Sequence, residues 1–389
     1  MRLRARIPSV DPGVMKPSAE CPYEDCQGTF FKQHQRGCRK RVRDSQYQRV
    51  TVYRRRCLRC GRTHRVYPQG VSRADQTDRL KGLSIMLYLL GISYRGVGDA
   101  LNALGFPLSH STVYRNVQAG GKKVRELKQA TLQQRSREVK VVGGDLTYLK
   151  CKGERVVIGV AIDAQEGVTL DIQLLDNEET ETLKGWLMPL LDLVGAEVLT
   201  TDDQDGFKTV ADEAGVEHQV CRRHVTLNVL DFVSKAAQQV LDRPPPVPRE
   251  LSITSEQLLE DLQTLEWMML GHPEHGPKLL EEMYDRYSHA PPPRKGTRAT
   301  IWYRMRNQVL HLWNNWKRLT CYREFLHHEE FKVDETNNST ERVIGWQVKE
   351  RYRTMRGYKR PESILNVTTL IAWLQEQPPG NDMSLALAS

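Results

Sequence analysis

The sequence predicts a multidomain protein. A small cysteine-rich module and a helical module precede an α/β core that is interrupted by an all-helical insertion. Three observations support this prediction. Five of the eight cysteines lie before residue 61, residues 140–221 alternate β-branched runs with helical segments, and residues 231–330 have helical periodicity between proline clusters. At about 100–200 residues per domain, a chain of 389 residues has room for two to four such units.

The composition excludes several classes of protein. Apolar residues make up 39% and charged residues 27% of the chain, which is an ordinary composition for a chain long enough to bury a core. The longest nearly apolar run, Leu83 to Ile92, is far shorter than the ~20 residues of a membrane span. The N-terminus lacks the apolar segment of a secretory signal. We therefore expect a cytoplasmic, nucleoid-associated protein with no membrane partner.

Positive charge is concentrated at the N-terminus. The chain has 57 Lys and Arg against 48 Asp and Glu, a formal net charge of +9, whereas residues 1–65 alone carry 17 basic and 5 acidic side chains, a net charge of +12. The remainder is slightly acidic, at −3. Such a module suits a polyanion, most simply nucleic acid, although a solvated basic tail would have the same composition. The arginines that we expect to contact DNA are Arg54, Arg55, Arg56 and Arg59.

Four cysteines have the spacing of two metal-binding turns. They are Cys21, Cys26, Cys57 and Cys60. Each pair offers two thiolates, and four thiolates complete a tetrahedral zinc site. Without a secretory signal, a metal is favoured over disulfides. We predict a zinc ribbon with one structural Zn²⁺ and a strand from Arg49 to Tyr53. Cys38 or His34 could replace one ligand.

A compact helical unit follows the ribbon. Apolar residues recur at helical spacing between Asp75 and Leu90, and Ser93 and Gly105 suit the start and the end of a second helix. A third helix begins after Ser109. Helix, Gly-containing turn and helix form the helix-turn-helix pattern, in which the second helix enters the major groove of DNA, although any small helical bundle has the same pattern. The candidate DNA contacts of this helix are His110, Thr112, Arg115 and Asn116.

The pattern changes at Lys140, where β-branched runs begin. Three strands, then helix, strand, helix and strand, are predicted at 140–149, 155–163, 168–175, 180–194, 197–201, 207–214 and 218–221. This is the order of an RNase H-like core.

Two aspartates in this core suggest a metal site. Asp145 lies inside the first strand and Asp202 directly follows the fourth, so adjacent strands would bring their carboxylates together. Oxygen ligands suit Mg²⁺, and with a third carboxylate they can hold two ions about 3.5–4 Å apart for in-line phosphoryl displacement. An aspartate at a strand end is also a common turn residue, and Asp203 and Asp205 are alternatives to Asp202.

A third carboxylate comes much later in the chain. Asn337 or Asn338 can cap a helix that begins just before Glu341, and at 3.6 residues per turn Lys349 would lie on the same side of that helix. A carboxylate for metal and cations for DNA phosphate would then be neighbours. A surface glutamate on an ordinary basic helix is the simpler interpretation. The basic residues that we assign to DNA here are Lys349, Arg351 and Arg353.

Helical segments separate the second aspartate from the glutamate. Proline clusters interrupt residues 231–330, and Trp302, Trp313 and Trp316 recur at helical spacing. We expect these tryptophans to pack a core. The alternative is that Trp313 or Trp316 stacks on an exposed DNA base, with Arg318 on phosphate.

Together these motifs resemble those of DDE transposases. Asp145, Asp202 and Glu341 occur in the order of that family's catalytic triad. Three local motifs resemble the second-aspartate motif, the Cys-x-x-His signature and the glutamate-bearing helix of Mutator-like and related bacterial insertion-sequence transposases. They read Thr201-Asp202-x3-Gly206-Phe207, Cys221-Arg-Arg-His224, and Asn338-x-x-Glu341 followed by Lys349-x-Arg351-x-Arg353-x3-Gly357. The resemblance covers roughly residues 20–375.

The resemblance implies a transposase that binds the terminal inverted repeats of its element, cleaves the ends and joins the freed 3′-hydroxyl to target DNA. The triad would bind two Mg²⁺ or Mn²⁺ ions, one activating water or the 3′-hydroxyl and the other stabilising the leaving oxygen. It also implies a homodimer or larger assembly on double-stranded DNA. Cys221 and His224 are too few for a closed zinc site, so we expect them to be structural.

Two other functions use the same features. A metal-dependent nuclease or resolvase would share the triad but not join strands, and a DNA-binding regulator with an inactive core would have displaced carboxylates. We expect the C-terminal tail to be disordered or to form a short helix with a partner. The predicted units are a basic zinc-ribbon module at 1–70, a helix-turn-helix and linker at 71–137, an RNase H-like core at 138–230 and 331–375, a helical insertion at 231–330 and the tail at 376–389.

Overall fold

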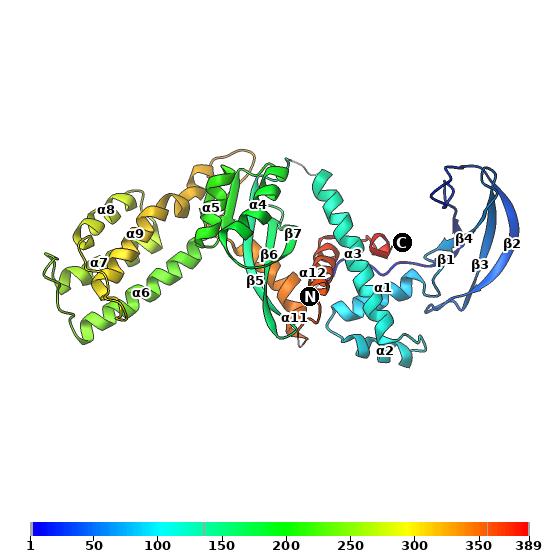
Figure 1. The fold of residues 1–389 in the computed structure, drawn as a ribbon, viewed down its shortest axis with the longest axis horizontal. Helices are drawn as coiled ribbons and strands as arrows, with labels where there is room; N and C mark the ends of the chain where they lie inside the picture. The colour runs from blue at the N-terminus through cyan, green and yellow to red at the C-terminus, as the bar shows by residue number, and fades with distance from the viewer. Residues whose placement is uncertain (1–2, 135–136, 356, 388–389) are drawn as a thin grey trace.

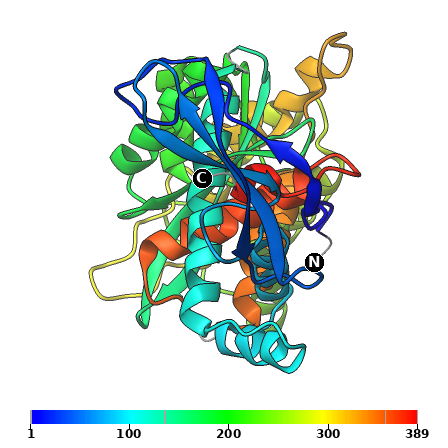
Figure 2. The same ribbon diagram turned by 90° about the vertical axis from the view of Figure 1, so that its right-hand side faces the viewer.

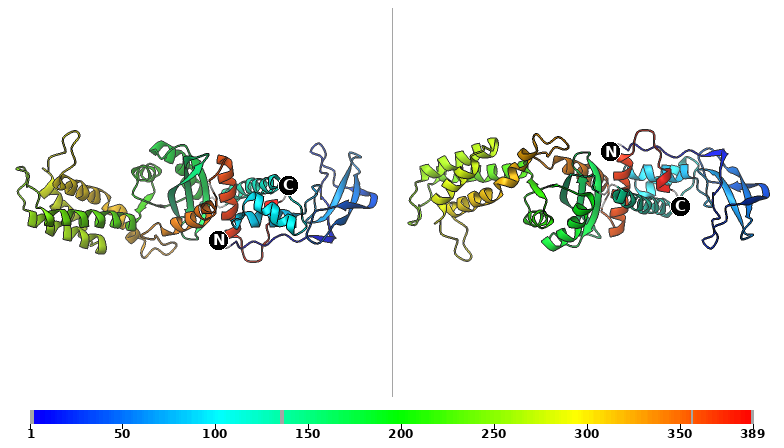
Figure 3. Two further views of the ribbon diagram at one scale, coloured as in Figure 1. Left: turned by 90° about the horizontal axis from the view of Figure 1, so that it is seen from below. Right: turned by 90° about the horizontal axis from the view of Figure 1, so that it is seen from above.

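The computed structural model describes residues 3–134, 137–355 and 357–387. The molecule is elongated (Figure 1), with a four-stranded sheet at one end, a helical unit and an α/β core in the middle and a helical insertion at the other end. The views from below and above show the same succession (Figure 3).

The N-terminal module is an antiparallel sheet in the order β1-β4-β3-β2, which faces the viewer in Figure 2. Its strands are β1 (Asp11–Lys16), β2 (Phe31–Arg41), β3 (Arg49–Cys57) and β4 (Thr63–Gln69). On β3 the buried Val50 and Val52 alternate with exposed neighbours, as period-2 patterning requires. The strand predicted from Arg49 is therefore confirmed, and it continues to Cys57.

Three helices follow: α1 (Asp78–Leu89), α2 (Tyr94–Ala103) and α3 (His110–Gln134). Ser93 caps α2 as predicted, because its hydroxyl accepts a hydrogen bond from the Gly96 amide at 3.0 Å. Gly105 follows the end of α2 with a φ of +82°, a conformation that glycine adopts without strain. Helix α3 continues to Gln134 and so includes most of the predicted linker at the end of the 71–137 unit.

The core sheet has the order β7-β6-β5-β8-β9, with β5, β6 and β7 antiparallel and β8 and β9 parallel to β5. Its elements are β5 (Val141–Cys151), β6 (Glu154–Asp163), β7 (Val168–Leu175), α4 (Thr180–Val194), β8 (Val198–Thr201), α5 (Asp205–Ala214) and β9 (Glu217–Val220). The predicted RNase H-like order of elements is confirmed. Successive residues of β6 pack on opposite faces: Ala161 belongs to the cluster with α4 and α5, whereas Val160 belongs to the cluster with the C-terminal helices.

The insertion is a bundle with a hydrophobic core of its own. Its helices are α6 (Arg222–Asp242), α7 (Ser255–Gly271), α8 (Gly276–Tyr287) and α9 (Ile301–Thr320), and a 3₁₀ turn, η1 (Cys321–Phe325), leads back to the core. The predicted boundary at residue 231 falls inside α6, which begins directly after the core sheet. Trp302 and Trp316 are buried, which confirms the prediction that they pack a core.

The C-terminal part contains α10 (Asn338–Val343), the π-helical segment η2 (Ile344–Lys349), α11 (Glu350–Arg353), α12 (Pro361–Glu376) and α13 (Ser384–Leu387). The prediction of one regular helix after Glu341 is wrong, because η2 breaks the 3.6-residue phase. Disorder of the tail is also wrong as far as Leu387. Met383 and Ala386 are buried against the helical unit, and the backbone of Met383 bonds to Arg6.

One hydrophobic cluster joins the helical unit to the core. It contains Leu101 and Val117 from the helical unit, Val160 from the sheet, and Val348 and Leu370 from the C-terminal part. In Figure 1, α12 lies between the sheet and α3. Within the described residues, no helix is both long and apolar enough to cross a membrane.

Candidate active site

Strand pairing brings the two predicted aspartates to one level of the sheet. β5 and β8 are parallel neighbours, with Val141 opposite Val198 and Gly143 opposite Thr200. Two residues further in the same register, Asp145 on β5 is level with Asp202, which directly follows β8. Asp145 and Asp202 are 57 positions apart in sequence, and every pair of opposite residues on β5 and β8 has this same separation.

Glu341 comes near enough to Asp145 to affect its pKa because α10 packs closely on β5. The side-chain amide of Asn337 donates to the Gly144 carbonyl at 2.9 Å, and the Thr340 hydroxyl donates to the Asn337 side chain at 2.5 Å. A Cβ atom on Gly143 would lie 2.3 Å from the Thr340 hydroxyl. Gly143 thus permits a helix approach that a side chain would block.

The electrostatics of the three carboxylates suit a divalent cation. Burial, followed by the charges of Asp202 and Glu341, raises the pKa of Asp145 to about 7. Burial also raises the pKa of Asp202. Carboxylate oxygens are the ligands that Mg²⁺ prefers, and a bound cation would offset the repulsion between these carboxylates. The donor set therefore fits magnesium or manganese.

The two alternatives to Asp202 have other partners. Asp203 pairs with Lys208 at 2.8 Å and with His311 at 2.6 Å. Burial raises its pKa, but the hydrogen bonds from His311 and Lys208 outweigh burial and hold it below its ordinary value. Asp205 is exposed at the start of α5 and pairs with Lys208 at 2.9 Å. Of these three aspartates, Asp202 is the one whose charge raises the pKa of Asp145.

Cys221 and His224 lie against Glu341. The buried Cys221 sulfur accepts a hydrogen bond from the Asn337 amide at 3.3 Å, and the His224 Nε2 atom lies 3.5 Å from Glu341 Oε1. The contact with Cys221, then the charges of Cys221, Glu341 and Asp145, raise the pKa of His224 to about 9 despite partial burial. Burial raises the pKa of the Cys221 thiol, but hydrogen bonds with His224 and with the Asn337 amide outweigh burial. The pKa of Cys221 is therefore below its ordinary value.

The four predicted zinc ligands, Cys21, Cys26, Cys57 and Cys60, form one cluster. The sulfurs of Cys21 and Cys60 are 3.8 Å apart, as are those of Cys26 and Cys57. Zn–S bonds of about 2.3 Å at tetrahedral angles place sulfurs about 3.8 Å apart, so the cluster fits Zn²⁺. Cys38 packs in a separate valine-rich cluster and His34 is exposed on β2, so neither belongs to this group.

The predicted arginines of this module do not share one face. Along β3, Arg54 and Arg56 point to one side of the sheet and Arg55 to the other, because side chains alternate. Arg54 lies directly opposite Arg65 of β4, an unfavourable like-charge pair in the absence of an anion. Arg59 is exposed in the turn that carries the second pair of cysteines.

The start of α3 presents three of its four predicted DNA contacts. His110 and Arg115 are exposed and Thr112 is half-buried. Asn116 contradicts the prediction. Its amide donates to Gln76 at 2.8 Å and to Ser84 at 3.0 Å, so it ties α3 to α1 and the segment before it.

Lys349 and Arg353 are exposed beyond Glu341, but Arg351 corrects the prediction. It is 2% exposed, its guanidinium lies 4.3 Å from the centre of the Tyr88 ring, and it donates to the Ile92 carbonyl at 3.4 Å. Arg351 therefore links the glutamate-bearing segment to the helical unit and does not face DNA.

Two features of the site have no local signal in the sequence. His311, which forms a hydrogen bond with Asp203, comes from α9 of the insertion, 108 positions away. Arg318 binds both carboxylate oxygens of Asp212 at 2.8 Å and also contacts His218, so it is not free for the phosphate contact of the alternative prediction.

Trp316 is buried, so the base-stacking alternative is wrong for this residue. Trp313 is half-buried against Tyr284.

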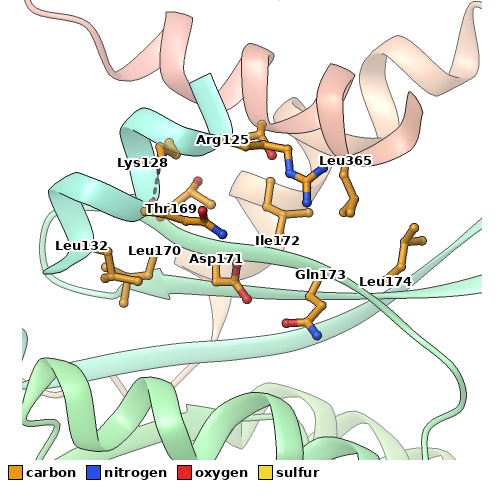
Figure 4. Close-up of a pocket in the computed structure, with 12 residues that line it drawn as sticks. Arg125, Lys128, Leu132, Thr169, Leu170, Asp171, Ile172, Gln173, Leu174 and Leu365 are labelled. Atoms are coloured by element: carbon orange, nitrogen blue, oxygen red, sulfur yellow. Dashed lines mark hydrogen bonds between the residues drawn. The ribbon is translucent and has the colours of Figure 1, made fainter. Parts of the chain in front are cut away.

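A pocket of about 410 Å³ lies elsewhere, between α3, β7 and α12 (Figure 4). Lys128 lies at one side of the pocket and donates to the Thr169 carbonyl at 2.7 Å and to Glu376 at 2.6 Å. Burial raises the pKa of Asp171, another lining residue, although Trp186 donates a hydrogen bond to that carboxylate. None of the triad lines this pocket, so it belongs to the junction between the helical unit and the core.

An RNase H-like sheet that carries acidic residues at one edge is the architecture of a class of DNA-recombining enzymes. Within that class, the chain belongs to the Mutator family of transposases, because residues 26–243 match the family model described as "Transposase, Mutator family".

Solved structures that resemble this chain include the HTLV-2 integrase catalytic core domain in complex with magnesium, in a trimeric and a dimeric form. Both are 15% identical over 33% of this chain, cover 84% and 85% of the integrase chains, and have a TM-score of 0.19. No curated protein matches the chain.

Proposed function

We propose that this protein is a DDE transposase that binds the ends of its element, cleaves them by metal-dependent phosphodiester hydrolysis and joins the freed 3′-hydroxyl to target DNA. The observation that carries the proposal is the convergence of Asp145, Asp202 and Glu341 from β5, β8 and α10 in a chain of the Mutator family. An inactive regulator would have displaced carboxylates, and here they lie close enough to perturb one another.

In the proposed site, Asp145, Asp202 and Glu341 hold two Mg²⁺ or Mn²⁺ ions. When bound, these ions would activate the attacking water or 3′-hydroxyl and stabilise the leaving oxygen. The protein's own part is positioning. Asn337 locks α10 against β5, and the amide of Leu146 donates to the Asp145 carboxylate at 2.7 Å. Without a metal ion, protonated His224 lies 3.5 Å from Glu341 and offsets its charge.

The DNA-binding role falls to the N-terminal half. We propose that the four-cysteine module is a zinc ribbon with one structural Zn²⁺, and that its exposed arginines bind the phosphates of double-stranded DNA. In the same proposal, the exposed start of α3 contacts the bases of the terminal repeats in the major groove. A homodimer or larger assembly on paired ends, in the cytoplasm, completes the proposal.

A strand-transfer assay with element-end DNA, target DNA and Mg²⁺ tests the chemistry. Asp145→Asn, Asp202→Asn and Glu341→Gln should each reduce cleavage by more than about 100-fold, because each removes a metal ligand, while DNA binding stays nearly unchanged. Asp205→Asn is the matched control. It removes an exposed carboxylate three positions from Asp202 and should cleave normally.

Two outcomes would change the assignment. Cleavage without joining would support the nuclease or resolvase alternative. Activity of Asp202→Asn together with inactivity of Asp203→Asn would move the second metal ligand to Asp203. The ribbon has a separate test, since Cys57→Ser should lose one zinc ion per chain and weaken binding to end DNA.

A further inference from the structure

A sulfur, an imidazole and a carboxylate converge beside the triad. One ligand atom from each of Cys221, His224 and Glu341 lies within 4.8 Å of the others. Cys221 immediately precedes α6, His224 lies in the first turn of that helix, and Glu341 comes from α10. Two elements that are far apart in sequence therefore present three metal-binding groups to one point.

The distance between two of the three ligand atoms suits a tetrahedral ion. Two ligands bound to Zn²⁺ at about 2.0–2.1 Å and at the tetrahedral angle lie about 3.4 Å apart. The observed distance from His224 Nε2 to Glu341 Oε1 is 3.5 Å. The backbone amide of Asn337 also donates to the Cys221 sulfur, and such an outer hydrogen bond stabilises a metal-bound thiolate.

Two buried atoms of the cluster have unmet bonding capacity. Across the described residues, Glu341 Oε1 and the Nδ1 atom of His224 find no hydrogen-bond partner of normal geometry. Buried polar atoms are nearly always satisfied, so such an atom calls for an explanation, of which an ion is one. Both atoms belong to residues that bind metals.

We propose that Cys221, His224 and Glu341 form a zinc-binding site distinct from both the four-cysteine cluster and the magnesium site. Thiolate and imidazole select Zn²⁺, whereas Mg²⁺ takes oxygen ligands. Three protein ligands leave a fourth position open to water, unlike a closed structural site.

Zinc at this site takes Glu341 from the magnesium ions. The same carboxylate is a member of the proposed catalytic triad, and its occupied oxygen is then oriented toward Cys221 and His224. Zinc would thus inhibit Mg²⁺-dependent cleavage. This consequence rests on the proposed function, whereas zinc binding itself does not.

Metal counting on the metal-free, full-length protein tests the site. Wild type should bind two zinc equivalents, and Co²⁺ should report two environments, one with four sulfur ligands and one with a single sulfur. His224→Gln and Cys221→Ser should each lose one equivalent and keep the four-sulfur spectrum. Cys321→Ser is the matched control, since this cysteine is also buried but lies in η1 outside the cluster, and it should keep both equivalents.

The outcomes separate the two proposals. A single zinc equivalent in the wild type, or two equivalents in both His224→Gln and Cys221→Ser, overturns the site. If the second equivalent binds and the protein cleaves no DNA under any condition, the site stands and the proposed function fails. If the protein cleaves equally well with the second equivalent bound, Glu341 is not shared and the inhibitory role is overturned.

Discussion

A chain of hydrogen bonds connects the insertion to the backbone of Asp202. Arg318 of α9 donates to His218 Nδ1 at 3.1 Å, His218 Nε2 lies 2.9 Å from the Thr201 hydroxyl, and that hydroxyl donates to the Asp202 carbonyl at 2.7 Å. Because a guanidinium only donates, Nδ1 must accept and the imidazole must be neutral. The insertion thereby supports the loop that carries a proposed metal ligand.

This chain predicts a pH dependence of stability. Burial, and then the charge of Arg318, lower the pKa of His218 to about 3, whereas an unfolded histidine titrates near 6.5. The unfolded state therefore binds the proton more readily, and the free energy of unfolding should decrease as the pH falls from about 6.5 toward 3. Urea unfolding across this range measures the effect.

His218→Gln should weaken this dependence, because glutamine does not titrate and keeps a polar side chain. His289→Gln, at an exposed position, is the control and should leave the pH profile as in the wild type. Identical profiles for the wild type and His218→Gln would show that His218 does not carry the effect.

For single residues, the sequence predicted which side chains form the candidate site better than it predicted which side chains contact one another. Asp145 and Asp202 could be chosen because each stands at a definite place on a strand. The contact between Asp203 and His311 could not be predicted, since it forms only when α9 folds back on the core. The hydrogen bonds of Asn116 and the burial of Arg351 were missed for the same reason. Both are polar residues whose partners lie on distant elements.

At the scale of elements, the site depends on how closely α10 approaches β5. Gly143→Ala should destabilise the protein by about 1–3 kcal/mol, because the new Cβ would lie 2.3 Å from the Thr340 hydroxyl and α10 would have to move. Cleavage should fall as well, since Glu341 moves with α10. Chemical denaturation and the cleavage assay measure the two effects.

Gly144→Ala is the matched control for this change. Its Cβ would meet its nearest neighbour, Thr201, at 3.6 Å, an ordinary contact. Equal losses of stability in Gly143→Ala and Gly144→Ala would show that strand flexibility, and not the approach of α10, determines the effect.

The basic sheet makes a second prediction at this scale. Arg54 and Arg65 face each other across β3 and β4, so Arg65→Ala should leave stability unchanged or raise it slightly. If this pair binds phosphate, the same change should weaken DNA binding and reduce the slope of log K against log salt by about 1. Arg249→Ala removes an exposed charge from the insertion and serves as the control in salt titrations. An unchanged slope for Arg65→Ala would place the DNA elsewhere.

Element order could be predicted well because each core strand and helix carries its own periodicity. The segment η2 could not, since a π-helix has no distinctive pattern and the prediction assumed 3.6 residues per turn throughout. Trp346 stands out on this segment, 56% exposed and five positions after Glu341.

At the scale of the whole molecule, chain order conceals how the parts are joined. The helical unit ends at Gln134 and α12 begins only at Pro361, yet both contribute to one hydrophobic cluster. The insertion has its own core. The protein is therefore expected to unfold as a central body that includes the helical unit, with the insertion as a separate cooperative unit.

The contact between α3 and α12 tests this organisation. A Cβ atom on Gly121 would lie 2.3 Å from the Asn366 carbonyl oxygen, which is backbone and cannot move aside as a side chain would. Gly121→Ala should therefore push α3 from α12 and cost about 1–3 kcal/mol. In calorimetry, the transition of the central body should shift to lower temperature, while that of the insertion should not. Gly185→Ala, on the open face of α4, should keep or raise the wild-type stability, because alanine favours a helix. A shift of both transitions by Gly121→Ala would mean that the insertion unfolds with the central body.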